Sequence, residues 1–493
     1  MTKLHAISKS KSKTTTTTHI CPPSEFGGPI GCLLTIILLP VLVLILAHWA
    51  KIGYLDLNFI SIKKETFILL FGGNDNDNNN DNGNGNDNDN DSSYILLFKC
   101  LLGLLGWFIT LVILWIVLPG QWVEGAPVID PEIDYTASAS ASGTNNKDKP
   151  KLRRLKYKLN GHLTFWIIMI ALAVTKFPLN DYLYKHYEKL AFVDILLCFG
   201  LSTYLYITSF INNNNKDGKN SKNCKNSKKK ILSHTGRSNN HIYDYFMGRE
   251  LNPRSLSGKF DWKQFCELRP GLILWLLLNF SCAQEQYVLR NGSISGSMIL
   301  LNIFHFIYVW DSLYNERSIL TTMDITTDGF GFMLIFGDMC WVPFTYNHTT
   351  KYLVNHDPQL SIFNLILIFI LYVVGFYIFR SSNKQKDIFR SNPLDARVNK
   401  LNYIKTIRGT CLLTSGWWGY ARKINYTGDY VMGLSYSLLC GFNSIVPYYY
   451  SIYFLILLVH RSIRDDELCS IKYGNDWIEY KRQVPYRFIP GIV

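Results

Sequence analysis

Residues 361–380 read SIFNLILIFILYVVGFYIFR and contain a single charged residue, the arginine at the end. A helix that crosses the hydrocarbon core of a bilayer needs about 20 mostly apolar residues, and this segment has that length and composition. A helix that is apolar all round is typical of a membrane span or of the core of a large protein. The segment therefore predicts a membrane-spanning helix.

Similar apolar blocks recur along the chain on both sides of this one. Five are equally apolar, at 31–50, 94–118, 162–176, 190–211 and 446–460. Four are weaker and lie at 270–282, 297–314, 329–346 and 430–445, and the first three of them contain Asn279, Asn302, His305, Asp311 and Asp338. Together the blocks predict an all-α, polytopic integral membrane protein with about ten transmembrane helices. We interpret 31–50 as a membrane anchor rather than a cleaved signal, since no small-residue cleavage site follows it.

Composition agrees with this class and excludes an ordinary soluble enzyme. Of the 493 residues, 48% are apolar and only 18% are charged, against about 25% charged in a typical soluble domain. The eleven cysteines are scattered without any C-x-x-C pair, which argues against a zinc module and a disulfide scaffold. The net charge of +13 is typical of nucleic-acid-binding proteins or of proteins at a membrane surface, and the position of the charges decides between them.

The lysines and arginines lie predominantly on one side of the predicted bundle. If the N-terminus is cytosolic and the ten helices alternate, 38 of these residues fall in cytosolic segments and 7 on the other side. Positive charge accumulates in cytosolic loops of membrane proteins. We therefore expect both termini in the cytosol, association with the bilayer, and no nucleic-acid partner.

Low-complexity segments divide the chain. We expect a basic cytosolic tail at 1–30, a first membrane anchor at 31–50, an Asn/Asp-rich disordered loop at 51–93 and a membrane domain at 94–493. A polar insertion at 212–241 interrupts that domain; it is either a solvated linker or a lipid- or nucleic-acid-binding patch, and we favour the linker. The sequon at Asn347 is a candidate glycan site in a loop predicted to face away from the cytosol.

The common motifs of soluble enzymes are absent from the sequence. It contains no G-x-x-x-x-G-K-[ST], no H-E-x-x-H and no G-x-S-x-G, and Gly329-Phe-Gly331 lacks the remaining glycine of a dinucleotide fingerprint. We expect no metal site. A nucleotide cofactor would need a pocket of another kind.

Acidic residues gather around the predicted helix ends between Tyr308 and Asp338. This group contains Asp311, Glu316, Asp324, Asp328 and Asp338, with few cations nearby in the sequence. Because polar groups at membrane depth are costly, they indicate either function or pairing. Two interpretations stay open: a polar wall of a buried pocket, or helix caps and interhelical hydrogen bonds.

The final segment, 381–493, combines cations with aromatic residues. Lysine and arginine suit phosphates, and aromatic faces suit a nicotinamide or adenine ring. The alternative is a membrane-interface belt of cations and aromatic side chains. The acids Asp465, Asp466 and Glu467 lie beside Arg461 and Arg464. They favour a site, since three acidic residues are not expected among interfacial cations and aromatic side chains.

Long motifs in this chain resemble the sterol reductase family, which includes Δ14-sterol reductases, 7-dehydrocholesterol reductases and the membrane part of the lamin B receptor. The resemblance runs from about residue 94 to the C-terminus, and the Δ14 branch is the most similar. The motifs include LPGQWVEGAP (118–127), YDYFMGRELNPR (243–254), FCELRPGL (265–272), TTMDITTDGFGFMLIFGDMCWVPFTY (321–346), SGWWGYARKINYTGD (415–429) and LLVHRSIRDDELCSIKYGNDWIEY (457–480).

This resemblance implies an NADPH-dependent oxidoreductase of sterol biosynthesis that reduces the C14–C15 double bond by protonation followed by hydride transfer. It implies Tyr308 or Asp465 as the catalytic proton source, without choosing between them. It places the cofactor-binding part in 381–493, with the residues Lys386, Arg390, Leu413, Trp418, Asn425, Tyr426, Asp465, Cys469, Tyr473 and Tyr480. One departure lies in this pocket, because Lys423-Ile424 stands where the family usually has His-Pro.

The resemblance also implies a cellular location and partners, and it leaves several alternative functions. We expect a multi-pass protein of the endoplasmic reticulum membrane, extending to the nuclear envelope, with a sterol substrate and other sterol-pathway enzymes as candidate partners. The nearest alternative is a 7-dehydrocholesterol reductase, which acts on a different double bond. The alternatives of other classes are a membrane methyltransferase and a structural protein like the lamin B receptor.

Overall fold

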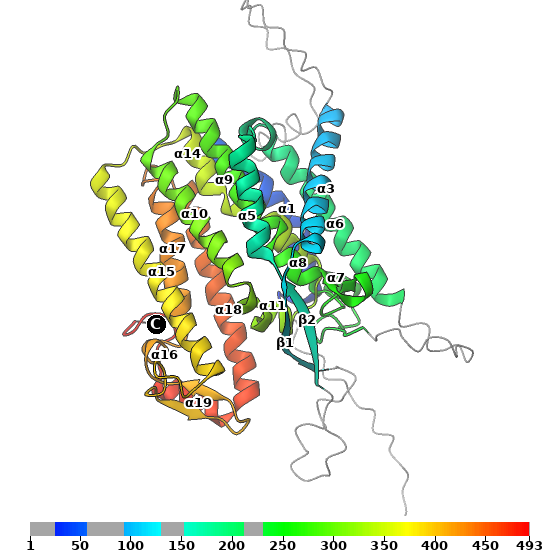
Figure 1. The fold of residues 1–493 in the computed structure, drawn as a ribbon, viewed down its shortest axis with the longest axis vertical. Helices are drawn as coiled ribbons and strands as arrows, with labels where there is room; N and C mark the ends of the chain where they lie inside the picture. The colour runs from blue at the N-terminus through cyan, green and yellow to red at the C-terminus, as the bar shows by residue number, and fades with distance from the viewer. Residues whose placement is uncertain (1–24, 57–92, 130–151, 212–229, 493) are drawn as a thin grey trace, which may run out of the picture.

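The computed structural model describes residues 25–56, 93–129, 152–211 and 230–492. Within these ranges it is mostly helical, and the long helices run roughly along the long axis of the molecule (Figure 1). Six segments in these ranges are long and apolar enough to cross a membrane by length and composition. They are α1 (Gly28–Ile52), α3 (Ser93–Val117), α6 (Tyr187–Ile211), α8 with α9 (Trp262–Leu268 and Pro270–Leu289), α10 (Gly296–Tyr314) and α15 (Ile362–Ser391). The predicted polytopic helical membrane protein is thereby confirmed.

The remaining predicted blocks are also helical, but they are shorter, interrupted or partly charged. They correspond to α5 (Gly161–Thr175), α17 (Ile424–Leu438), α18 (Tyr449–Tyr473) and a broken run of α12 (Phe332–Phe336), η5 (Gly337–Trp341) and α13 (Val342–Tyr346). The π-helical turn η5 interrupts the last of these at Gly337-Asp338. The prediction that all ten blocks cross the bilayer stays a prediction.

Short elements link these helices. They are α7 (His241–Met247), α11 (Met323–Thr326), α14 (His348–Asn355), α16 (Trp417–Tyr420), α19 (Asn475–Gln483), η1 (Asn180–Tyr184), η3 (Leu256–Gly258), η4 (Glu316–Thr321) and η6 (Val446–Tyr448).

Within the described ranges, three two-stranded antiparallel sheets lie between the helices, and the all-α prediction did not include them. They pair β1 (Gln121–Ile129) with β2 (Leu152–Leu159), β3 (Arg254–Ser255) with β4 (Phe260–Asp261), and β5 (Tyr403–Lys405) with β6 (Cys411–Leu413). The register of the first pair shifts between Glu124 and Pro127, where proline has no N–H to donate to a ladder. The hairpins sit in polar connections, so they leave the helical bundle intact.

Close packing of the bundle depends on glycine at two crossings. A Cβ on Gly271 would lie 1.7 Å from the Asp338 carbonyl oxygen, so only glycine allows the start of α9 to rest on η5. A Cβ on Gly428 would lie 2.6 Å from the Phe379 backbone nitrogen, where α17 crosses α15. Small residues let membrane helices approach this closely. The two crossings hold the aromatic and charged residues described below at fixed positions.

Segments predicted to share one side of the membrane meet at the same end of the bundle. Beside the start of α1, Glu25 lies 2.7 Å from Arg464 and the Phe26 ring lies 5.5 Å from the His460 ring. At the end of α1, the Lys51 carbonyl oxygen lies 3.1 Å from His356 Nε2. In Figure 1 the strands β1 and β2 and the helices α16 and α19 lie at the lower end, while α14 lies at the upper end. This arrangement agrees with the predicted alternation, and which end faces the cytosol stays a prediction.

Several sequence predictions fall outside the described residues. They concern 1–24 of the basic tail, 57–92 of the Asn/Asp-rich loop and 212–229 of the polar insertion.

Candidate active site

The predicted cofactor residues come together at the end of the bundle formed by α15 to α19. Lys386 and Arg390 lie on α15, Leu413 on β6 and Trp418 on α16, while Asn425 and Tyr426 begin α17, Asp465, Cys469 and Tyr473 lie on α18, and Tyr480 lies on α19. We call this set the cofactor pocket. Residues separated by almost a hundred positions thus share one end of the molecule (Figure 1).

The cationic wall of the cofactor pocket rests on a buried tryptophan. Lys386 Nζ lies 4.0 Å from the centre of the Trp418 ring. Trp418 is 5% exposed and its indole N–H donates to the Ser382 carbonyl at 2.9 Å, so α15 fixes the ring on which the ammonium sits. Leu413 packs in the same apolar cluster. The geometry holds one cation in place without neutralising it.

Arg390 lies one turn further along α15 and is exposed. Among the described residues, neither Lys386 nor Arg390 forms a salt bridge with a carboxylate. Adjacent cations without an acidic partner repel each other and bind an anion with a gain in free energy. These two side chains therefore form a candidate phosphate site.

The opposite wall holds an ion pair. The Lys423 ammonium contacts the Asp465 carboxylate and lies 5.6 Å from the Tyr426 ring centre. Asn425 donates from Nδ2 to Asn383 Oδ1 at 3.4 Å, while its buried Oδ1 has no hydrogen-bond partner. That oxygen is a free acceptor beside the cations, which suits an amide or hydroxyl donor of a bound molecule.

The floor of the pocket is aromatic and connects α18 to α19. Tyr473 and Trp477 stack at 6.2 Å between ring centres, and Trp477 contacts Tyr480 at 5.0 Å. Burial raises the pKa of the Tyr480 hydroxyl to about 12, with Arg422 acting in the opposite direction. Burial also raises the pKa of the Cys469 thiol to about 11. Both groups are neutral at physiological pH and do not oppose an anionic ligand.

The helix α18 continues through the acidic run, so Asp465 and Cys469, four positions apart, share one face of it. The neighbouring acid, Asp466, behaves differently from expectation. Its position a third of a turn away predicts a side chain directed to water or lipid headgroups, yet Asp466 accepts from Trp477 Nε1 at 2.9 Å and lies 3.7 Å from Lys481. The prediction fails because α19 folds back onto α18, so Asp466 anchors α19 instead.

The acidic group at 311–328 is paired with cations from distant parts of the chain. We call these four salt bridges the ion-pair belt. They join Asp311 to Arg380 at 3.1 Å, Glu316 to Arg269 at 2.6 Å, Asp324 to Arg461 at 2.6 Å and Asp328 to Arg464 at 3.0 Å. Arg269 and Asp328 are fully buried. The structure thus favours the pairing interpretation for these acids, whereas Asp338 has a buried oxygen without a partner.

Tyr308 belongs to a second compartment, an aromatic chamber between α9, α10, α13, α17 and α18. Tyr308 lies 5.9 Å from Trp275, which also contacts His305 at 4.7 Å and Tyr346 at 5.5 Å. His305 in turn lies 4.4 Å from Tyr436. Both His305 nitrogens and the Tyr436 hydroxyl are buried without partners, so the chamber is apolar with a few free polar atoms.

The two candidate proton donors therefore sit in different surroundings. Tyr308 interacts electrostatically with Asp429 and Arg461, whereas Asp465 is held by Lys423. Tyr450 of α18 lies 5.0 Å from Tyr346 and 5.6 Å from Tyr436 of the chamber, and Asp465 lies further along the same helix, so α18 joins the chamber to the cofactor pocket.

The predicted site residues did not include three residues of this region. Asp429 has a buried oxygen without a partner, Lys423 pairs with Asp465, and Trp477 links α18 to α19. An acid inside an apolar helix was the available signal for Asp429, and the substitution of the family's histidine was the signal for Lys423. The sequon, by contrast, is a correction: Asn347 is fully buried and donates to Asn279 Oδ1 at 2.7 Å, so it is closed to a glycan in this fold.

The chain is similar to known proteins over most of its length. The model of the ergosterol biosynthesis ERG4/ERG24 family matches residues 22–493. Delta(14)-sterol reductase erg24 of Schizosaccharomyces pombe is 43% identical over 398 residues, covering 80% of this chain and 85% of that protein. Delta(14)-sterol reductase ERG24 of Saccharomyces cerevisiae is 38% identical over 480 residues, covering 95% of this chain and 97% of that protein. Delta(14)-sterol reductase TM7SF2 of Mus musculus is 44% identical over 355 residues, covering 71% and 80%.

Proposed function

The chain belongs to the ergosterol biosynthesis ERG4/ERG24 family, and on that premise we propose that it is a Δ14-sterol reductase of sterol biosynthesis. The proposed enzyme reduces the C14–C15 double bond of a sterol intermediate with NADPH. The observation that carries the proposal is the arrangement along α18, which joins an aromatic chamber with free polar atoms to a pocket with two unpaired cations. The alternatives of a 7-dehydrocholesterol reductase and of a structural protein lack comparable support, since the three relatives described above are Delta(14)-sterol reductases.

The residues of the cofactor pocket fit NADPH. Lys386 and Arg390 would hold its 2′-phosphate, because charge-assisted contacts to phosphate need cations without other partners. The free Asn425 oxygen would accept from the carboxamide or a ribose hydroxyl. Bound NADPH supplies a hydride. The aromatic floor and the paired Asp465–Lys423 would orient the nicotinamide end toward α18 and the chamber.

An isolated alkene is a poor hydride acceptor, so the enzyme must first protonate it. A proton added at C15 forms a C–H bond with the electron pair of the double bond and leaves positive charge at C14. Hydride addition at C14 then completes the reduction. The product carries one new hydrogen at C15 from the proton and one at C14 from the hydride. The chamber excludes water, and the faces of Trp275, Tyr346 and Tyr436 stabilise a neighbouring cation.

We infer that Tyr308 delivers the proton and that Asp465 positions the cofactor. Tyr308 lies in the aromatic chamber on Trp275, with Asp429 beside it as a buried acid. Asp465 is engaged with Lys423, so its carboxylate serves to hold that cation in the pocket wall. General acid catalysis by a placed side chain contributes about 10²–10⁴ in rate.

The decisive experiment is turnover by purified protein in lipid nanodiscs with NADPH and a Δ8,14-sterol. The expected product lacks the C14–C15 double bond by mass spectrometry, with deuterium at C14 from 4-deuterated NADPH and at C15 from D₂O. A Δ5,7-sterol offered to the same preparation should remain unchanged. Reduction of that sterol instead would identify a Δ7 reductase, and binding of both ligands without turnover would favour a structural role.

The setting of the proposed enzyme follows from the family and the charge pattern. The chain is a multi-pass membrane protein. We propose that it resides in the endoplasmic reticulum membrane with both termini in the cytosol, where NADPH reaches the cofactor pocket. Protease protection of terminal tags tests the orientation, and a protected C-terminal tag would overturn it.

A further inference from the structure

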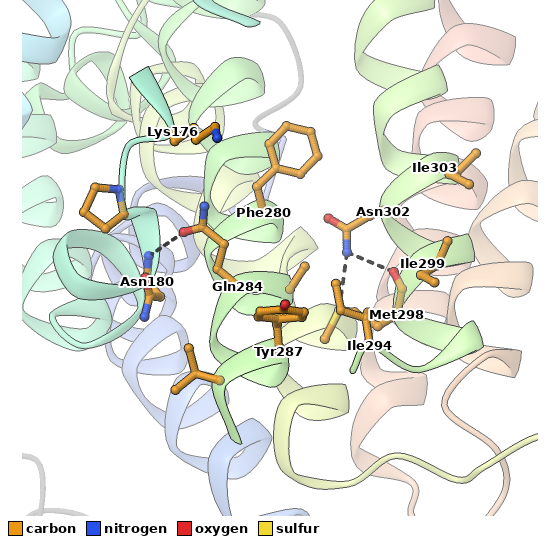
Figure 2. Close-up of a pocket in the computed structure, with 13 residues that line it drawn as sticks. Lys176, Asn180, Phe280, Gln284, Tyr287, Ile294, Met298, Ile299, Asn302 and Ile303 are labelled. Atoms are coloured by element: carbon orange, nitrogen blue, oxygen red, sulfur yellow. Dashed lines mark hydrogen bonds between the residues drawn. The ribbon is translucent and has the colours of Figure 1, made fainter. Parts of the chain in front are cut away.

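Two cavities lie between apolar helices of the described part of the chain, away from the cofactor pocket. The first, of about 610 Å³, lies between η1, α9 and α10, and Figure 2 shows the side chains that line it, Lys176 and Tyr287 among them. The second, of about 300 Å³, lies between α3, α6, α8 and α9, and we call it the α3–α6 cavity. Small-molecule sites typically have volumes of roughly 300–1,000 Å³. The charged residue that lines the first cavity is Lys176, and the one that lines the second is Asp194.

The α3–α6 cavity opens on a surface that a bilayer would cover. Leu105 of α3 and Leu196 of α6 line it and are 38% and 53% exposed. The helices α3 and α6 and the segment formed by α8 and α9 are all apolar enough to cross a membrane. A molecule that enters this cavity would therefore come from the lipid phase.

The tryptophan N–H groups in the wall of the α3–α6 cavity are already bonded within the protein. Trp107 Nε1 donates to the Pro270 carbonyl at 3.2 Å, and Trp262 Nε1 donates to Ser255 Oγ at 2.7 Å. Apart from these two tryptophans and Asp194, the lining residues have no polar side-chain atom other than the sulfur of a methionine. Among the described residues of this wall, Asp194 is therefore the polar group left without a partner.

Asp194 lies deep within its helix. It is the eighth of the 25 residues of α6, which places it about 10 Å from the start of the helix. Asp194 is only 3% exposed, and its Oδ2 is buried without a hydrogen-bond partner. The other oxygen, Oδ1, has no described donor either but is not fully buried, and it opens on the cavity that Asp194 lines.

The surroundings of Asp194 supply no positive charge. No described cation interacts with it electrostatically, and the ionisable groups beside it are the thiols of Cys198 and Cys340. A carboxylate without a cation is costly at membrane depth. An isolated Asp194 therefore keeps its proton, and a basic molecule that enters the cavity can take that proton and become its counterion.

We propose that the α3–α6 cavity binds an amphiphilic amine from the bilayer, a molecule with one basic nitrogen on a long alkyl chain, and that its ammonium group pairs with Asp194. The proton leaves the carboxyl oxygen and forms the new N–H bond, so the two charges appear together. A hydroxyl could donate to Oδ1 but could not neutralise the carboxylate, whereas an ammonium does both. The alkyl chain would lie on the apolar wall, and its end can extend past Leu105 and Leu196 into the lipid.

The helix α9 separates this site from the aromatic chamber. Leu274 lines the α3–α6 cavity, while the next residue, Trp275, lies 4.7 Å from His305 in the chamber. The amine would therefore occupy a site other than that of the proposed sterol substrate. Its binding can be measured without NADPH and without turnover, so the result does not depend on the reductase activity.

The first experiment compares two probes on the wild-type protein. Full-length protein in phosphatidylcholine nanodiscs is labelled with hexadecylamine that carries a photoreactive diazirine near its nitrogen, and separately with the corresponding hexadecanol. The amine should label peptides that contain 104–108 or 194–201 about tenfold more than the alcohol does. The cavity in Figure 2 is the internal control. Because Lys176 repels an ammonium, the amine should not exceed the alcohol on peptides that contain 280–288 or 298–303.

The second experiment removes the charge and keeps the shape of the side chain. Asp194→Asn should abolish the preference for the amine, while labelling by the alcohol stays at the wild-type level and shows that the cavity is still formed. The matched control is Asp181→Asn on η1, whose side chain is 48% exposed in a pair with Lys185. This variant should keep the full preference for the amine.

Three results would overturn the proposal. Equal labelling of the α3–α6 peptides by the amine and the alcohol in the wild type would show that only apolar surface is recognised. An unchanged preference for the amine in Asp194→Asn would remove the carboxyl group from the site. Amine labelling confined to the peptide around Tyr308 would assign the amine to the chamber instead.

Discussion

The ion-pair belt and the cofactor pocket use charge in opposite ways. In the belt every acid has a cationic partner, and Arg269 is fully buried against Glu316. In the pocket Lys386 lies on an aromatic ring and Arg390 is exposed, and among the described residues neither pairs with an acid. Paired charges within a membrane protein hold helices together, whereas unpaired cations at its end attract an anionic ligand. The presence of an acidic partner, rather than the number of charges, distinguishes the ion-pair belt from the proposed cofactor site.

The largest effect on folding is expected when a buried member of the ion-pair belt is removed. Arg269→Ala should abolish accumulation of folded protein, because an unpaired buried charge costs about 3–5 kcal/mol. Size-exclusion chromatography of detergent-solubilised protein measures this loss. The control is Arg482→Ala, whose partner Glu479 lies in an exposed pair, and it should behave as wild type. Normal folding of Arg269→Ala would contradict the structural role of the belt.

The next effect concerns the aromatic chamber. Tyr308→Phe should lower kcat about 10²-fold or more while leaving the KM for NADPH unchanged, because only the transferable proton is lost. Asp465→Asn should raise the KM for NADPH and change kcat only a few-fold, since Asp465 would no longer hold Lys423 in position beside the cofactor. Steady-state kinetics of purified variants provide the test, with the exposed Tyr204→Phe as control. The reverse pattern would make Asp465 the proton donor.

A smaller effect is expected at the unpaired cations. Lys386→Ala and Arg390→Ala should each raise the KM for NADPH roughly ten- to hundredfold, equivalent to about 1.5–3 kcal/mol for one charge-assisted contact. The weak use of NADH should change little because NADH lacks the 2′-phosphate. Unchanged NADPH affinity in both variants would make these residues membrane-interface cations.

The smallest expected effect concerns the Cys469 thiol in the cofactor pocket. With a pKa of about 11, Cys469 is almost entirely protonated at pH 7.5, and iodoacetamide should modify it slowly. The rate should rise about tenfold per pH unit up to that pKa, since the thiolate is the nucleophile. Lys423→Ala should slow the reaction further, because Lys423 lowers the thiol pKa. Peptide mapping by mass spectrometry follows this residue alone, and rapid modification at neutral pH would contradict its burial.

The apolar blocks were predictable from sequence because their signals are local, whereas the cofactor residues came from the family resemblance and stay a prediction. A block such as 361–380 carries its own hydropathy, and α15 appears there in the structure. The pairs of the belt could not be predicted, because Asp328 and Arg464 are 136 positions apart and no local pattern connects them. The predicted orientation of the Asp466 side chain was wrong for the same reason, since it depends on how α19 packs against α18.

Asn302 is a second example of what the sequence alone cannot show. The sequence marks Asn302 as a polar residue in an apolar block, but only the fold shows which of its atoms is already bonded. In the sequence, Lys423 was noted only as the replacement of the family's usual histidine. The structure shows that Lys423 is a cation that pairs with Asp465.

The long sequence separation within the belt also has a consequence for biosynthesis. A ribosome makes Asp324 and Asp328 well before it makes Arg461 and Arg464, and the N-terminal parts of a chain generally fold first. Until α18 emerges, these carboxylates lack their arginine partners, and the cation made before them that interacts with both is the buried Lys263. The late helix α18 therefore completes a charge cluster whose acids and whose lysine were both laid down much earlier in translation.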